Sequence, residues 1–182
     1  MAGAAAGEPP RPPGIIGRVG RAIYPGTFDP VTLGHLEIVR RGAALLGGLL
    51  VAVGVRVDKK TLFSVEERVA LLREAVEGID RVEVAPFRGL VVDFARAKGA
   101  TLLLRGVRNS SDYEYEARMA VTNARLAPGI ETLLLVADPQ TAFLSSTLIR
   151  EVAQSGGDLD AFVPPCVSRA LREKGRRPPP GT

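Results

Sequence analysis

Short apolar runs of strand type alternate with amphipathic, helix-like segments along the interior of the chain, and this alternation restricts the possible folds more than any other feature. LLVAVGV at 49–55 is the clearest run, because it is continuously apolar. Strands that are apolar on both faces are typical of parallel sheets covered by helices on both sides. We therefore predict an α/β fold: a Rossmann-like five-stranded parallel sheet with right-handed crossovers and helices on both faces, in a single domain.

The expected elements follow from hydrophobic periodicity and from helix-start signals. Two helices carry an S-x-x-E capping box, Ser64 with Glu67 and Ser111 with Glu114. The expected strands span 22–24, 49–55, 81–86, 101–105 and 131–137, and the expected helices span 34–46, 64–78, 90–98, 111–127 and 145–156, with one more after Pro164 and Pro165.

The two ends of the chain differ in composition from its interior. Residues 1–20 and 175–182 are rich in Pro, Gly, Arg and Ala, so we expect disordered tails around one compact domain at 21–174. No segment approaches the roughly 18–20 apolar residues of a membrane helix, and the first residues lack the apolar region of a secretory signal. The single cysteine, Cys166, lies among apolar residues and is expected to serve packing. Together these features favour a cytoplasmic protein without a membrane partner.

The net charge of +4 and the pI of about 9.6 raise the question of nucleic-acid binding. Part of the excess lies in the C-terminal stretch RALREKGRRPPP, and the few aromatic residues are not interleaved with basic ones. We therefore expect no nucleic-acid partner. A small substrate rich in phosphate explains the arginines and lysines of the interior equally well.

The loop after the first expected strand, YPGTFDPVTLGH (24–35), ends at the only histidine of the chain, His35. Its glycines allow backbone N–H groups to approach an anion, and the helix that follows favours negative charge at its start. Thr27 can donate its hydroxyl to a phosphate, and we expect His35 to be catalytic. Asp29, between Phe28 and Pro30, is expected to form the turn rather than to bind a metal. The loop matches neither the Walker A nor the G-x-G-x-x-G pattern.

Phosphate-binding residue types also follow three other strands, and the carboxyl ends of parallel strands meet at one edge of the sheet. A run of three hydroxyls at a helix start exceeds what N-capping needs, since a cap uses only one. Nothing indicates a covalent nucleophile, and a single histidine argues against many metal sites. The residues are Lys59 and Lys60 after the second strand, Arg105, Gly106, Arg108 and Glu116 after the fourth, and Ser145, Ser146 and Thr147 after the fifth.

With these residues in view, the sequence resembles a known family. YPGTFDPVTLGH resembles the T-x-G-H signature of the nucleotidyltransferase superfamily, and the chain from 21 to 172 is similar to the bacterial phosphopantetheine adenylyltransferases. KKTLFSVEERVAL, LLLRGVRNSSDYEYEARMA and FLSSTLIREVA match segments of that family in the same order and spacing. The resemblance implies adenylyl transfer from ATP to 4′-phosphopantetheine, giving dephospho-coenzyme A and pyrophosphate in coenzyme A biosynthesis. It also implies direct in-line attack with Mg²⁺, a homohexamer and feedback inhibition by coenzyme A.

The resemblance further implies roles for individual residues. His35 would stabilise the transition state, and no residue is expected to be a metal ligand. Phosphopantetheine would contact Thr27, Lys59, Val91 and Arg105. ATP would contact Thr27, Phe28, His35, Gly106, Val107, Arg108, Glu116, and Thr141, Ala142, Phe143, Leu144, Ser145, Ser146 and Thr147.

Departures from the family pattern are few: Leu33 before Gly34, Thr147 in place of a serine, and Arg56–Val57 near Lys59. The nearest alternative is a related enzyme acting on nicotinate mononucleotide or glycerol phosphate. Such enzymes usually carry H-x-G-H, whereas Thr32 stands at the first position here. A non-catalytic nucleotide-binding module is the alternative from another class, and the combination of His35, Thr27, Lys59 and Arg105 argues against it.

Overall fold

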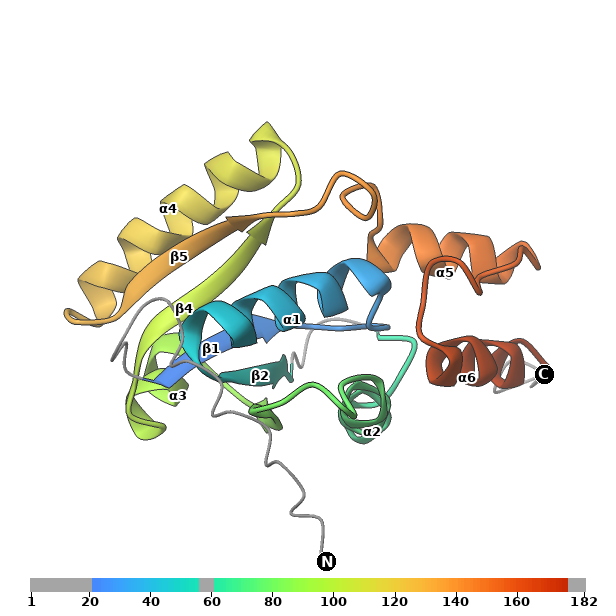
Figure 1. Cartoon of the computed structure of the whole chain (residues 1–182), viewed down its shortest axis with the longest axis horizontal. Helices are drawn as coiled ribbons and strands as arrows, with labels where there is room; N and C mark the ends of the chain where they lie inside the picture. The colour runs from blue at the N-terminus through green and yellow to red at the C-terminus, as the bar shows by residue number, and fades with distance from the viewer. Residues whose placement is uncertain (1–20, 56–60, 177–182) are drawn as a thin grey trace, which may run out of the picture.

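Five parallel strands form one sheet, as the sequence predicts, and their order in the sheet is β3-β2-β1-β4-β5. The computed structural model describes residues 21–55 and 61–176. The chain runs outward from β1 to β3, returns across the sheet and continues through β4 to β5 (Figure 1). The strands are β1 (Arg21–Gly26), β2 (Leu49–Gly54), β3 (Val82–Phe87), β4 (Ala100–Val107) and β5 (Glu131–Val136).

Helices cover both faces of this sheet. On one face of the sheet, a core cluster is formed with α1, α2, α5 and α6. On the other face, a second and smaller cluster is formed with α3. Helix α4 lies along β4 and β5 (Figure 1). The helices are α1 (Leu33–Leu46), α2 (Val65–Ala75), α3 (Val91–Ala97), α4 (Ser110–Leu126), α5 (Ser146–Gln154) and α6 (Pro165–Arg176).

Alternation along β2 explains why the apolar run at 49–55 has no polar face. Leu49, Val51 and Val53 belong to the larger core cluster, whereas Leu50 and Ala52 belong to the smaller one. Since successive side chains of a strand point to opposite faces, a central strand with helices on both sides must be apolar throughout. The burial pattern of β2 therefore confirms the prediction of a doubly covered sheet.

Of the two predicted capping boxes, the one at Ser64 is confirmed and the one at Ser111 is wrong. Ser64 accepts a hydrogen bond from Glu67 N–H, and the Glu67 carboxylate accepts one from Ser64 N–H. At α4 the N-cap is Asn109, whose side chain accepts from Asp112 N–H. Helix α4 therefore begins at Ser110, and Ser111 lies inside its first turn. Asn and Ser are equally good caps, so the local sequence does not decide between them.

The ends of the chain fall largely outside the described residues. Residues 1–20, expected to be a tail, are not described, nor are 177–182. Residues 175 and 176, which the sequence assigns to the second tail, belong to α6. Within the described ranges, no helix has the length and apolar character needed to cross a membrane.

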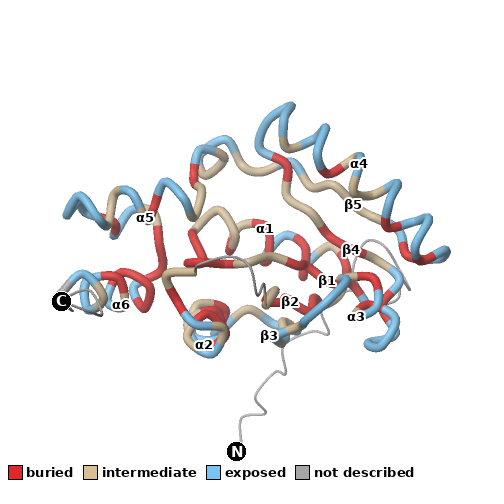
Figure 2. Tube along the Cα trace, turned by 180° about the vertical axis from the view of Figure 1, so that it is seen from behind, coloured by how far each residue is buried: buried red, intermediate tan, exposed pale blue. Residues whose placement is uncertain are grey.

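Burial is uneven over the molecule. Strands β1, β2 and β4 and helix α1 are rich in buried positions, whereas α4 is exposed along most of its length (Figure 2). Of the 17 residues of α4, only the polar Glu116 and Asn123 are buried. Tyr113, Tyr115, Val121 and Leu126 on the same helix are exposed apolar side chains.

Candidate active site

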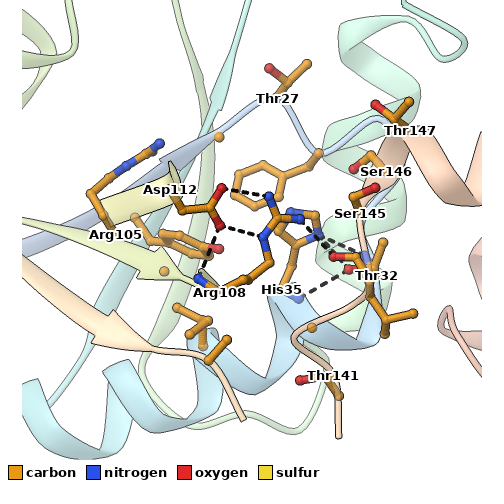
Figure 3. Close-up of a pocket in the computed structure, with 18 of the residues that line it drawn as sticks. Thr27, Thr32, His35, Arg105, Arg108, Asp112, Thr141, Ser145, Ser146 and Thr147 are labelled. Atoms are coloured by element: carbon orange, nitrogen blue, oxygen red, sulfur yellow. Dashed lines mark hydrogen bonds and ion pairs between the residues drawn. The ribbon is translucent and has the colours of Figure 1, made fainter. Parts of the chain in front are cut away.

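A cavity of about 310 Å³ opens at the carboxyl ends of the strands, where the loops after β1, β4 and β5 meet. Thr27 lies in the loop after β1 and His35 in the first turn of α1. Arg105 lies near the end of β4 and Arg108 directly after it, and the hydroxyls lie at the start of α5 (Figure 3). In open α/β sheets ligands bind outside this edge. Three of the four strand ends predicted from the sequence therefore converge on one cavity.

A capping interaction at the start of α1 holds His35. Thr32 is the N-cap, and its hydroxyl accepts a hydrogen bond from His35 N–H at 3.3 Å. In return, Thr32 N–H donates to Nδ1 of the imidazole at 3.1 Å, and the Thr32 hydroxyl lies 2.9 Å from the same nitrogen. The histidine thus takes the place that Glu or Gln has in an ordinary capping box.

This arrangement determines the proton position on the imidazole. Because a backbone N–H can only donate, Nδ1 of His35 must accept, and the ring proton lies on Nε2. Removal from water lowers the pKa of His35 to about 4, and the positive charges of Arg108 and Arg105 act in the same direction. The cavity therefore contains a neutral imidazole whose free nitrogen is a hydrogen-bond donor at neutral pH.

Two carboxylates of α4 neutralise the two arginines at the end of β4. Arg105 donates from Nε and Nη2 to the two oxygens of Glu116, and its Nη1 donates to the carbonyl of Pro25. Arg108 donates from Nε at 2.7 Å and from Nη2 at 3.1 Å to Asp112 (Figure 3). These side chains line the cavity, so the arginines are oriented toward it while their charge is already paired.

The hydroxyls before and within α5 have three different partners. Ser145 is the N-cap and accepts from Leu148 N–H at 3.1 Å. Ser146 donates to the carbonyl of Pro30 at 2.8 Å, and Thr147 accepts from Arg150 Nη2 at 3.2 Å. Only one of the three hydroxyls is needed as a cap, as the sequence predicts, and all three line the cavity.

Gly34 allows α1 to approach the loop after β5. A Cβ at this position would lie 3.1 Å from the carbonyl oxygen of Thr141, which is tighter than nearly all real contacts. A backbone oxygen cannot move aside as a side chain can. The glycine before His35 is therefore explained by the packing of the loop that lines the other wall of the cavity.

Most of the residues predicted from the sequence line the cavity, but several do not. Val91 is the first residue of α3, Val107 is buried, and Phe143 is exposed with its ring against Phe162. Neither they nor Ala142 belong to the lining, and Lys59 and Lys60 lie outside the described residues, as do Arg56 and Val57. The predicted residues that line the cavity are Thr27, Phe28, His35, Arg105, Gly106, Arg108, Glu116, Thr141, Leu144, Ser145, Ser146 and Thr147.

The further lining residues to which the sequence interpretation assigned no role include Thr32, Asp112 and Arg150. The spacing of Thr32 and His35 matches a capping box if histidine is allowed in the place of glutamate. Asp112 follows Arg108 by four residues, which is the spacing of a helical ion pair. Arg150 follows Thr147 by three residues on α5 and reaches Thr147 along the helix surface.

Asp29 and Cys166 behave largely as expected. The Asp29 side chain is buried, and its two oxygens accept from Leu62 N–H at 2.8 Å and Phe63 N–H at 2.9 Å. It therefore organises backbone, although it joins two loops rather than a single turn. Cys166 is buried and its Sγ–H donates to the carbonyl of Leu71, and burial raises the pKa of its thiol.

Each of the three carboxylates that line the cavity is already engaged: Asp29 by backbone N–H groups, Asp112 by Arg108 and Glu116 by Arg105. Within the described ranges, no group of three His, Cys, Asp or Glu side chains is arranged to hold a metal ion. This donor set fits Mg²⁺ that is bound mainly by phosphate oxygens and water, since Mg²⁺ keeps several waters and often uses substrate phosphates as ligands.

Comparisons with known proteins agree with this geometry. Residues 23–152 match the family model described as cytidylyltransferase-like. The chain is 47% identical over 156 residues to the phosphopantetheine adenylyltransferase of Caldanaerobacter subterraneus subsp. tengcongensis, covering 86% of this chain and 98% of the relative. It is 48% identical over 155 residues to the enzyme of the same name from Thiobacillus denitrificans, covering 85% of this chain and 97% of the relative.

A solved structure has the same fold. It is described as a nicotinate-nucleotide adenylyltransferase from Vibrio parahaemolyticus and superposes with a TM-score of 0.64. The match covers 86% of this chain and 95% of that one, at 16% sequence identity. At this identity the likeness concerns the fold alone.

Proposed function

The chain belongs to the cytidylyltransferase-like family, and we infer that it is a nucleotidyltransferase that transfers the adenylyl group of ATP to 4′-phosphopantetheine. The products are dephospho-coenzyme A and pyrophosphate, in coenzyme A biosynthesis. Two relatives named for this activity match the chain over 98% and 97% of their own length, which supports the inference. The observation that carries the inference is the cavity that unites His35, two arginines and the hydroxyls of α5.

His35 acts on the charge that develops at the α-phosphate. The acceptor phosphate attacks the α-phosphorus in line, the bond to the pyrophosphate breaks, and no covalent enzyme intermediate is needed. Such reactions require mainly positioning and stabilisation of charge. The Nε2–H of a neutral imidazole, fixed through Nδ1 by Thr32, donates to an oxygen of the α-phosphate without any proton being transferred.

The remaining groups of the cavity bind phosphates. Arg108 and the N-terminus of α5, with Ser145, Ser146 and Thr147, would hold the polyphosphate of ATP, because free N–H groups and a guanidinium both favour anions. Thr27 would face both substrates. Phe28, Gly106, Val107, Glu116, and Thr141, Ala142, Phe143 and Leu144 are proposed to complete the nucleotide site, and Lys59, Val91 and Arg105 the acceptor site.

Mg²⁺ is proposed to enter with ATP and to supply positive charge to the phosphate oxygens. The protein would hold the metal-bearing phosphates through Arg108 and the hydroxyls of α5 rather than through carboxylates, which are engaged elsewhere.

Three further properties are proposed from the resemblance: a homohexamer, feedback inhibition by coenzyme A and a cytoplasmic location. The exposed apolar side chains of α4, among them Tyr113 and Val121, support the hexamer, because such a helix face is unusual on a monomer. Sedimentation velocity would measure the assembly. A monomer at micromolar concentration would contradict this part of the proposal.

One assay tests the function. The purified protein is incubated with MgATP and 4′-phosphopantetheine, and pyrophosphate and dephospho-coenzyme A are measured. Nicotinate mononucleotide with ATP and glycerol 3-phosphate with CTP serve as the competing substrate pairs. We expect product only with phosphopantetheine. Turnover of either competing pair with none of phosphopantetheine would assign the chain to a different reaction of its superfamily.

A further inference from the structure

Arg68 is a buried arginine that lies outside the cavity. Its side chain on α2 is 3% exposed, although arginine is almost never fully buried without partners. Its Nη1 donates to the carbonyls of Thr27 at 2.6 Å and Gly54 at 2.9 Å, and its Nε donates to the carbonyl of Phe63 at 3.2 Å. One guanidinium thus binds three backbone oxygens.

Those three oxygens belong to separate parts of the chain. Thr27 is in the loop after β1, Gly54 is the last residue of β2, and Phe63 precedes α2. Asp29 joins two of these parts, because it lies in the loop after β1 and its carboxylate accepts from Leu62 N–H and Phe63 N–H before α2. The Arg68–Asp29 network therefore attaches the loop that carries Thr27 to the chain on both sides of residues 56–60.

The carboxylate of Asp29 faces two arginines of this network. Burial lowers the pKa of Arg68, and the charge of Asp29 opposes that shift. On its other side Asp29 faces Arg150 of α5, which donates to the Asp29 carbonyl and lies 3.6 Å from its carboxylate. A buried charge is tolerated when it is paired and hydrogen-bonded, so removing one member leaves its partners unsatisfied.

We propose that Arg68 is a positioning residue for adenylyl transfer, which fixes the backbone of Thr27 relative to β2 and to the segment before α2. It touches neither substrate, because it does not line the cavity. It acts through Thr27, whose side chain does line it. This proposal rests on the proposed function.

Positioning of this kind affects turnover more than binding. The proposed ATP site draws on residues from several elements, so a small shift of one loop should change the affinity for ATP little. In-line attack requires close alignment of the reacting atoms, and a misplacement of about 1 Å can cost on the order of 100-fold in rate. A defect confined to alignment therefore lowers kcat and leaves the dissociation constant of ATP nearly unchanged.

Arg68→Lys tests this, with Arg73→Lys as the matched control. Lysine keeps the charge, but its compact ammonium cannot replace a planar guanidinium that donates in several directions. Arg73 is an exposed arginine of the same helix, donating to the carbonyl of Val84 at 3.3 Å. We expect Arg68→Lys to lower kcat by about 10- to 100-fold, with the ATP dissociation constant within about threefold of wild type. A kcat equal to that of Arg73→Lys, or equal losses in kcat and ATP affinity, would overturn the proposal.

A double-mutant cycle separates positioning from general destabilisation. If Arg68 acts through Thr27, the two substitutions should not lower kcat independently. The fold-decrease in kcat of Arg68→Lys/Thr27→Ala should then be at least about tenfold smaller than the product of the decreases in the two single variants. In the control pair Arg73→Lys/Thr27→Ala, the fold-decrease in kcat should equal the product of the decreases in the two single variants. Independent effects of Arg68 and Thr27 would contradict the proposed route.

A second variant covers the case in which Arg68→Lys does not fold. Asp29→Asn keeps the shape of the side chain but replaces one of the two acceptors with a donor. We expect faster amide exchange at Leu62 and Phe63 together with a lower kcat, and unchanged exchange or unchanged kcat would count against the network.

If the wild-type protein makes no product, the proposed function fails. Amide exchange at Leu62 and Phe63 then still reports whether the network forms, and rapid exchange in the wild type would refute it.

Discussion

The two sides of the cavity are built on different principles. On the β1 side, neutral groups are held by backbone hydrogen bonds: Thr32 fixes the imidazole of His35, and Arg68 fixes the carbonyl of Thr27. On the β4 side, Arg105 and Arg108 are held in ion pairs with carboxylates of α4. In the proposed reaction, the first side would be preorganised for the transition state, whereas the second would share its charge with an incoming phosphate. Electrostatic preorganisation accounts for much of enzymatic rate enhancement, so mutations on the β1 side should mainly affect turnover.

Removing the imidazole is the strongest test of this division. We expect His35→Ala to lower kcat by about 10²–10³-fold, the usual cost of losing one transition-state donor. The dissociation constant of ATP, measured by calorimetry, should change little. Arg40→Ala, an exposed position on the same helix, is the control and should behave as wild type. Unaffected turnover would show that His35 has been misassigned.

The protonation state of His35 tests whether the β1 side of the cavity holds a neutral group. Because the chain has a single histidine, its NMR titration can be read without assignment. We expect a midpoint near the pKa of about 4 and, at pH 7, a neutral ring protonated at Nε2. The unfolded chain binds this proton below about pH 6.5. The contribution of His35 to the free energy of unfolding should therefore rise with pH between about 4 and 6.5 and then level off. The measured rise should be smaller in His35→Gln, where acidic groups such as Asp112 still contribute. A midpoint near 6.5 would mean that the ring is solvated.

Replacing Thr32, the N-cap of α1, should lower turnover less than replacing His35 does. Thr32→Val removes the hydroxyl that accepts from His35 N–H but leaves the backbone donor to Nδ1. We expect a loss of about 1 kcal/mol in the free energy of unfolding, typical of a lost N-cap. Turnover should fall by about tenfold, since part of the imidazole's orientation is lost. Thr32→Ser keeps the hydroxyl and should be close to wild type. If both variants are equally active, the cap does not orient the ring.

The smallest effect is expected on the β4 side, with the opposite sign. Asp112→Asn removes a negative charge from the cavity and releases Arg108 from its ion pair. We expect ATP to bind about two- to fivefold more tightly, in line with the modest strength of partly exposed ion pairs. Asp93→Asn, an exposed acid of α3 paired with Arg96, is the control and should leave ATP binding unchanged. Weaker binding in Asp112→Asn would mean that the carboxylate itself contacts the nucleotide or its metal.

Much of the fold could be predicted because each element has its own local signal. The continuous apolar run at 49–55 is a central strand, and the Ser64–Glu67 box begins α2. The start of α4 could not be placed, because Asn109 and Ser111 are both good caps. The choice depends on where β4 ends, and β4 continues to Val107 through pairing with β5. That pairing is a tertiary contact.

The candidate site was predictable where residue chemistry and strand ends coincide, as at His35, Arg105 and Ser145. Arg68 was not predictable, because an arginine on a helix with neighbouring glutamates resembles an ordinary solvated face. Its burial follows from three carbonyls that only the folded chain brings together. Val91 and Phe143 came from the resemblance alone, and neither lines the cavity.

The capping box of α1 joins two properties that are usually mutated separately. In most helices the first turn can be redesigned without regard to chemistry, because its cap contacts only backbone. Here the third residue of the helix is both half of the cap and the proposed catalyst. A library screened only for turnover would therefore also retain a well-capped helix, and a library screened only for thermal stability could replace His35 with glutamate and produce a sturdier, inactive protein.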